Sequence, residues 1–156
     1  MTRPRTNQVI AFPLKEVLEK DANGQLYLDV WTHMEAISAL LNDDAWKQRC
    51  ENLVLREKLA ASRAGQILTT RMMSAASLMI LARNWLAERV ADDDAITQLG
   101  RLGVGIGDEE RWWDDESTPE ELQQLCLIAE GLLARVRSAA GLLRKAVEAE
   151  QTRGAA

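Results

Sequence analysis

The segment that decides the fold is Leu68-Thr69-Thr70-Arg71-Met72-Met73-Ser74-Ala75-Ala76-Ser77-Leu78-Met79-Ile80-Leu81-Ala82-Arg83. It contains no glycine or proline, and its apolar residues recur three and four positions apart, which is the spacing of one helix face. The main stripe consists of Leu68, Met72, Ala75, Met79, Ala82 and Leu86, and a neighbouring row of Ile67, Ser74, Leu78, Leu81 and Trp85 broadens it. So wide a face needs cover on more than one side. The pattern therefore predicts a long helix that is central in a bundle or that also packs against a second chain.

Helical periodicity continues upstream of this segment. Apolar residues three and four apart predict a first amphipathic helix from Leu26 to Leu41, after an Asn23-Gly24 turn. A second helical region, which contains the segment above, is expected from Ala45 to about Val90, with a break near Gly65.

The last helix has the clearest start. In Thr118-Pro119-Glu120-Glu121, the threonine is an N-cap, the proline suits the first helical position and Glu121 completes a capping box. From Leu122 to Ala146 the apolar residues alternate steps of three and four, as in helices packed nearly parallel to their neighbours. Gly131 and Gly141 lie inside this helix, and we expect a neighbouring backbone to approach closely there.

A long interruption from Asp92 to Ser117 precedes the last helix. We expect a short helix over 95–102 and a flexible connector through the glycine-rich run 103–107. Trp112 and Trp113 follow among acidic residues, and they must bury against something. One interpretation is that they close the end of the bundle; the other is that they form a partner-docking patch with an acidic rim.

Length and pattern together indicate one all-α domain, a three-helix bundle with an irregular connector before the last helix. The 156 residues divide into an N-terminal arm over 1–25 with a short helix from Pro13 to Lys20, a helical bundle over 26–150, and a short tail over 151–156. No leader opens the chain and the two cysteines have no CxxC spacing, so a cytoplasmic protein with inert thiols is expected. The longest apolar run, 78–82, is too short to cross a membrane. The net charge of −5 argues against nucleic acid as a partner.

The sequence offers no catalytic centre. His33 is the one histidine, so metal sites and triads that need further imidazoles lack their residues, and we expect His33 to be an ordinary helix residue. The Glu16-x-x-Glu19 pair lacks the second acidic motif of helical hydrolases, and the run 103–107 lacks the context of a phosphate loop. Asp43-Asp44 and Asp92-Asp93-Asp94 are predicted at helix ends. We therefore expect no enzyme activity, no cofactor and no metal.

The segment 68–83 resembles the signature of the family of RcdA, the regulator of CtrA degradation. The matching residues are Leu68, Thr69, Thr70, Arg71, Met73, Ala76, Ser77, Met79, Leu81 and Arg83. A second similarity lies in 118–122 and 133–136, which resemble the start and middle of the family's last helix.

The resemblance implies a dimeric three-helix bundle that acts as a non-catalytic adaptor, delivering regulatory proteins to the ClpXP protease in bacterial cell-cycle control. The candidate partner-binding residues are Trp112, Trp113, Arg71 and Arg83. A symmetric homodimer is also expected from the wide apolar face and the adaptable side chains of Met72, Met73 and Met79. A helical regulator that binds another protein or nucleic acid, unrelated to proteolysis, is the alternative, and a metal-dependent helical hydrolase is a third, more distant one.

Overall fold

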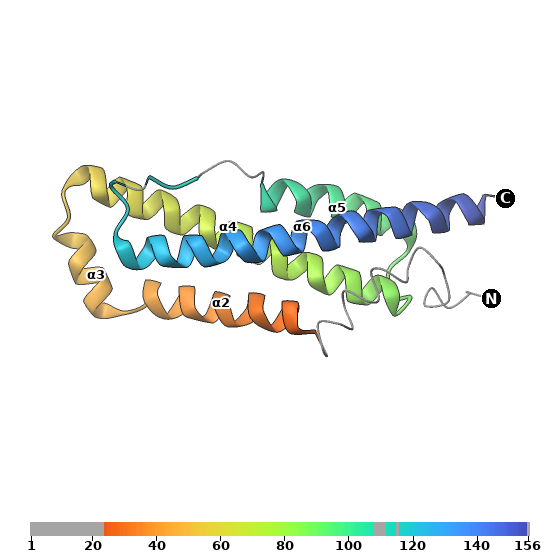
Figure 1. The fold of residues 1–156 in the computed structure, drawn as a ribbon, viewed down its shortest axis with the longest axis horizontal. Coiled ribbons are helices and arrows are strands. Elements are labelled where there is room, and N and C mark those ends of the chain that lie inside the picture. Colours follow the sequence, from red (N-terminus) through yellow and green to blue (C-terminus); the bar gives the residue numbers. More distant parts are fainter. Residues whose placement is uncertain (1–23, 108–111, 115, 156) are drawn as a thin grey trace.

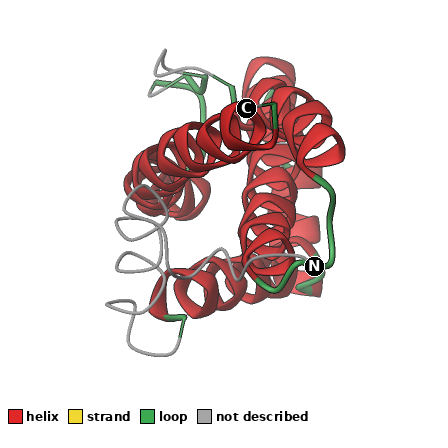
Figure 2. Ribbon diagram, turned by 90° about the vertical axis from the view of Figure 1, so that its right-hand side faces the viewer, coloured by secondary structure: helices red, strands yellow, loops and turns green. Residues whose placement is uncertain are grey.

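The computed structural model describes residues 24–107, 112–114 and 116–155. Within them the chain forms five helices and no strand (Figure 2). The helices are α2 (Gln25–Leu41), α3 (Asp44–Glu51), α4 (Leu55–Leu86), α5 (Asp92–Ile106) and α6 (Glu120–Gly154). The all-α prediction is confirmed, but the description as a three-helix bundle is incomplete. The helix expected over 95–102 is present and longer, as α5, and the predicted helical region 45–90 divides into α3 and α4. The helix expected from Pro13 to Lys20 lies outside the described residues.

The four longer helices run alternately in opposite directions along the molecule. Figure 1 shows α4 and α6 crossing in the middle, with α2 on one side of this pair, α5 on the other and α3 at one end. Both α4 and α6 pack against α2 and against α5. The helix built from the segment 68–83 is therefore central, as its two apolar rows predict.

Both apolar rows of α4 are covered within this one chain. Leu68, Met72 and Met79 of the main stripe are fully buried, as are Leu78 and Trp85 of the neighbouring row. The width of the apolar face is thus explained by α2, α5 and α6, and it does not require a second chain.

The break expected near Gly65 is wrong, because α4 continues through this residue without interruption. Gly65 is buried where α2 ends, and a Cβ there would lie 3.7 Å from Leu41 Cδ2, an ordinary contact. The chain turns instead at residues 52–54, after α3, where Val54 has extended backbone angles. The break in the predicted helical region 45–90 therefore lies between α3 and α4, and not at Gly65.

The glycine-rich run 103–107 is also not the flexible connector that we predicted. Helix α5 includes Gly100, Gly103 and Gly105 and ends at Ile106. The glycines are held in the helix because Ala95, Leu99 and Ile106 bury one of its faces. Gly105 lies directly against Ser74 of α4, where a Cβ would collide with the serine hydroxyl. The missing side chain lets α5 approach α4 closely.

Helix α6 begins where it was predicted, but the capping box does not form. Pro119 is the N-cap, no side chain caps the helix, and the buried Thr118 hydroxyl has no hydrogen-bond partner among the described residues. Glu121 instead pairs with Arg49 of α3. The close contacts expected at Gly131 and Gly141 are absent, since a Cβ at either position would meet nothing described within 4 Å.

The end of α6 extends into the region predicted as a tail. The helix continues to Gly154, and Gln151 donates a hydrogen bond of 2.8 Å to Asp93 at the start of α5.

Candidate functional site

The two tryptophans predicted to bind a partner lie against the first half of α4. Their exposed fractions are only 7% for Trp112 and 6% for Trp113, and the rings meet edge to face with centroids 5.0 Å apart. Both tryptophans lie beside Leu55, Leu59 and Arg63 in the first turns of α4. This burial agrees with the interpretation in which the tryptophans cover the bundle.

Arg71 contacts the same connector from α4. Its guanidinium carbon lies 5.1 Å from the centroid of the Trp112 ring, a cation–π geometry. The guanidinium also packs against Gly107, where a Cβ would come within 2.6 Å of it. The Gly107 carbonyl accepts a 3.3 Å hydrogen bond from Arg137 Nε of α6. Arg71 therefore positions the exit from α5.

Arg83 makes a similar contact at the other end of α4. Its guanidinium carbon lies 4.5 Å from the Tyr27 ring centroid, and it packs against Gly24, where a Cβ would collide with it. Gly24 precedes α2 and has a left-handed backbone. The contacts of both candidate arginines are thus intramolecular, and a role in partner binding stays a prediction.

Two signature threonines differ in surroundings. The Thr69 hydroxyl donates a 2.8 Å hydrogen bond to the Gly65 carbonyl one turn earlier, so it is satisfied within α4. Thr70 is exposed and borders a groove that the sequence did not predict.

This groove, which we call the elbow groove, lies between the end of α2, α3 and α4 and has a volume of about 820 Å³. Apolar or small residues line its inner part, namely Leu41, Trp46, Ala61 and Gly65. Exposed polar residues form its rim, including Lys58, Gln66 and Thr70. The volume falls in the range of binding sites for ligands and for side chains of a partner.

An uncharged stripe of α4 continues from the rim of the elbow groove. It consists of Thr70, Met73, Ser77 and Ile80, which are exposed and spaced three and four apart; we call it the uncharged face. Met73 and Ile80 are 56% and 42% exposed. No charged residue occurs between Arg71 and Arg83, although 28% of the chain is charged. That gap is visible in the sequence and could have identified the face.

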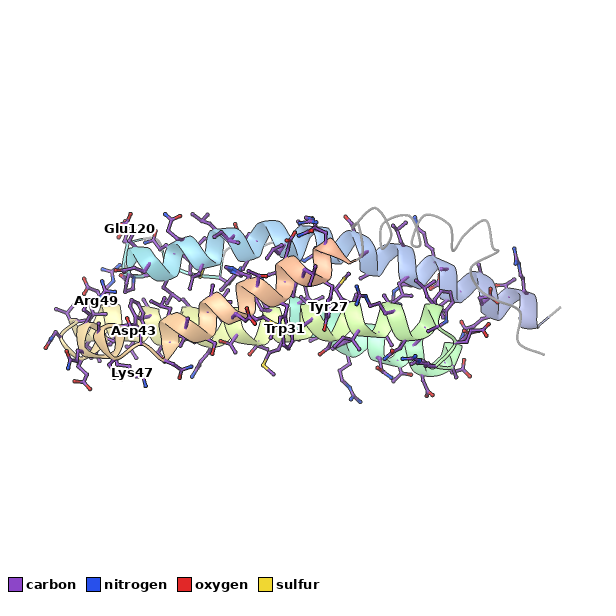
Figure 3. All side chains as sticks on the ribbon, turned by 90° about the horizontal axis from the view of Figure 1, so that it is seen from below. Tyr27, Trp31, Asp43, Lys47, Arg49 and Glu120 are labelled. Carbon is purple, nitrogen blue, oxygen red and sulfur yellow. The ribbon has the colours of Figure 1, made fainter. Side chains whose placement is uncertain are left out.

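Helix α2 adds an aromatic side chain on the side nearest α4. Trp31 is 47% exposed and stacks on Tyr27, with ring centroids 6.3 Å apart and an angle of 19° between the planes. Figure 3 shows both residues at the border between α2 and α4. Exposed tryptophan and methionine side chains are typical of surfaces that bind other proteins.

Burial shifts the pKa values of three titratable side chains among the described residues, those of His33, Cys50 and Cys126. His33 is buried, its Nε2 lies 2.8 Å from the Leu125 carbonyl oxygen of α6, and burial lowers the pKa of the imidazole despite that hydrogen bond. Burial raises the pKa of the Cys126 thiol to about 12, with a smaller contribution from Glu130. Burial also raises the pKa of Cys50, so both thiols are protonated at neutral pH.

The aspartate clusters lie at helix starts, as predicted. Asp43 precedes α3, and the run 92–94 forms the first turn of α5, where negative charge favours the helix dipole. Asp92 Oδ1 accepts a 2.8 Å hydrogen bond from the indole of Trp85. In the part of the chain that the structure describes, no three His, Cys, Asp or Glu side chains are grouped to hold a metal ion. None of the helices in that part combines the length and apolar character needed to cross a bilayer.

Comparisons of this chain with protein-family models, with curated proteins and with solved structures find no match. The resemblance of residues 68–83 to the RcdA family therefore stays a prediction.

Proposed function

We propose that this chain is a non-catalytic adaptor that docks another protein on the uncharged face and the elbow groove. The single observation that carries the proposal is the uncharged face itself. A surface helix normally presents charge to water, and here an exposed stripe with methionine and isoleucine continues into an apolar groove. Burying such a stripe against a partner removes apolar surface from water, and α4 carries no charged residue between Arg71 and Arg83 that would lose water with it.

The resemblance at residues 68–83 supports a more specific role. In that role the adaptor works in the bacterial cytoplasm and delivers regulatory proteins to ClpXP during the cell cycle. Thr70, Met73 and Ser77, which belong to the resembling segment, are exposed on the proposed docking surface. Arg71, Arg83, Trp112 and Trp113 then support binding by holding the connector and α2 in place.

The proposed homodimer would use the same stripe and would therefore compete with a partner protein for it. Two copies of α4 that pair antiparallel about Met73 place Thr70 of one chain near Ser77 of the other, so the surface is complementary to itself. Sedimentation equilibrium at tens of micromolar tests this proposal, and a monomer throughout that range would overturn it.

The test of the adaptor function compares two matched glutamate substitutions. Met73→Glu places a charge in the uncharged face, whereas Ala134→Glu places one on the exposed side of α6. Each purified variant captures proteins from a bacterial lysate, and the captured proteins are identified by mass spectrometry. We expect the parent and Ala134→Glu to capture ClpX or its cargo and Met73→Glu to lose them at least tenfold, because burying an unpaired charge opposes docking.

Two other results would overturn parts of the proposal. Equal capture by both variants would mean that the uncharged face binds no partner. Loss of a specific partner other than ClpX or a ClpXP substrate would favour the regulator unrelated to proteolysis. A captured nucleic acid whose binding weakens steeply with salt would favour a nucleic-acid regulator, against the acidic balance of the chain.

A further inference from the structure

The two halves of α5 differ in what holds them to the bundle. The first half, residues 92–99, begins with three aspartates, whose negative charge favours the helix dipole. Asp92 accepts a hydrogen bond from Trp85 of α4, and Asp93 accepts one from Gln151 of α6. The first half is therefore fixed to both neighbouring helices.

The second half, residues 100–106, has little in its own sequence that favours a helix. Three of its seven residues are glycines, and glycine is the least favourable helix residue after proline. Val104 is 82% exposed, and Ile106 is the one residue of this half that is buried. The last turn has no basic residue to complement the helix dipole. So short a segment is helical only because it packs against other helices.

The contacts that keep the second half in place lie at its end. Gly105 packs against Ser74 of α4, where a Cβ would collide with the serine. Gly107, directly after the helix, packs against the Arg71 guanidinium, and its carbonyl accepts the hydrogen bond from Arg137 of α6. Two neighbouring helices thus supply the positive charge that favours the carboxyl end of α5. These contacts are lost when the segment moves away.

The second half of α5 also borders the uncharged face of α4. Arg101 lines a small pocket together with Ser77, one of the four residues of that face. Ser74, three residues earlier on α4, is the residue that Gly105 contacts. Movement of the second half away from α4 would therefore enlarge the uncharged face and remove a positive charge from its edge.

We propose that residues 100–107 form a flap, which unwinds and leaves α4 and α6 while the first half of α5 and the rest of the bundle stay folded. We call this segment the α5 flap. When it opens, it uncovers Ser74 and the side of α4 that leads to the uncharged face, so it controls how much of that surface is accessible. The opening depends on the contacts of α5 and not on the proposed adaptor function.

Hydrogen exchange of the full chain, followed by mass spectrometry, tests the proposal. Amides that exchange by local opening do so faster than core amides, and low concentrations of urea hardly change their rate, because local opening exposes little surface. We expect this behaviour for peptides from the α5 flap and a steep dependence on urea for peptides from residues 72–82 of α4. Equal rates with the same dependence on urea would overturn the proposal, because α5 would then open only with the whole bundle.

Matched glycine substitutions locate the opening. Gly100→Ala and Gly103→Ala each favour the helix, and the new methyl group meets nothing described within 4 Å. Each should slow exchange of the α5 flap about fivefold. Gly131→Ala and Gly141→Ala make the same change at two positions of α6 that are equally open. They should change exchange of the flap by less than about twofold, because local opening leaves α6 folded. Equal slowing by the substitutions in α5 and in α6 would overturn the proposal.

Discussion

The Arg71 and Arg83 contacts use the same components at two places on α4. In each, a guanidinium lies over an aromatic ring and packs against a glycine with a positive φ. They differ in burial and in what they hold. Arg71 is partly buried and packs against Gly107 and the buried Trp112 ring, whereas Arg83 is exposed and packs against Gly24 and the half-buried Tyr27 ring. Two arginines with the same kinds of neighbours should therefore contribute differently to stability, because the strength of each cation–π contact depends on how deeply its ring is buried.

The largest difference in stability between the two regions is expected when the aromatic ring of each contact is removed. Trp112→Ala should lower the free energy of unfolding by about 3–5 kcal/mol, because the lost ring leaves the first half of α4 uncovered. Tyr27→Ala, which removes a half-buried ring, should cost about 1 kcal/mol. Urea unfolding followed by circular dichroism measures both. If Trp112→Ala costs no more than Tyr27→Ala, the tryptophan does not act as part of the core, and the docking-patch interpretation regains support.

The glycines give the next largest difference. Gly107 has φ 76° and ψ −173°, a conformation found almost only in glycine, whereas Gly24 has φ 88° and ψ 39°, a left-handed conformation that asparagine tolerates. Gly107→Asn should therefore destabilise the protein by about 1–3 kcal/mol, and it should also displace Arg71. Gly24→Asn should cost less, about 1 kcal/mol, because the guanidinium that it meets is at the exposed end of a movable side chain. The same unfolding measurement on both variants checks the order, and equal costs would contradict it.

The arginines themselves should differ by less. Arg71→Ala removes a partly buried cation–π contact and should cost about 1–2 kcal/mol, whereas Arg83→Ala removes an exposed one and should cost about 0.5–1 kcal/mol. A double-mutant cycle that pairs each arginine with its ring separates the contact from the general loss of packing. A coupling energy near zero between Arg71 and Trp112 would mean that their proximity contributes nothing.

The regular parts of this fold could be predicted from the sequence because their cause is local. The steps of three and four in α4 and α6 require burial on one face wherever the helices pack. The start of α6 near Pro119 follows from the proline, but its cap does not, because the pairing of Glu121 with Arg49 depends on where α3 lies. Local preference decided the helix boundary, and tertiary contacts decided the hydrogen bonds.

The elbow groove could not be predicted, because it depends on where one helix ends beside another. The elbow groove exists because α3 turns across the end of α2. The helical state of residues 103–106 depends likewise on the contact between Gly105 and Ser74, which no spacing within the run reveals. The candidate residues Arg71 and Trp112 were found in separate motifs, and only the fold brings them together.

The smallest expected effect is a pH dependence of stability. It arises from a contact between α2 and α6 that involves neither arginine. His33 is buried beside the Leu125 carbonyl, and burial lowers the pKa of the imidazole in the folded chain. A lowered folded-state pKa means that the unfolded chain binds the proton more readily. The contribution of His33 to stability is therefore complete above the ordinary pKa of about 6.5 and declines as the pH falls below it. The nearby Asp29 carboxyl, whose pKa is lowered by hydrogen bonds from Gln25 and then Arg135, titrates at lower pH and leaves this range unaffected.

Because His33 is the one histidine of the chain, the pH dependence of stability between pH 7 and 5 isolates this link. The parent, Arg71→Ala and Arg83→Ala should all lose stability with the same slope, since arginine stays charged throughout. His33→Gln should lower stability at pH 7 and flatten the slope, because its side chain has no proton to gain in this range. Urea midpoints at half-unit pH intervals measure it. A slope that persists in His33→Gln would mean that another group causes the pH dependence of stability. A slope that disappears in Arg71→Ala would mean that the Arg71–Trp112 contact and the His33–Leu125 contact are coupled.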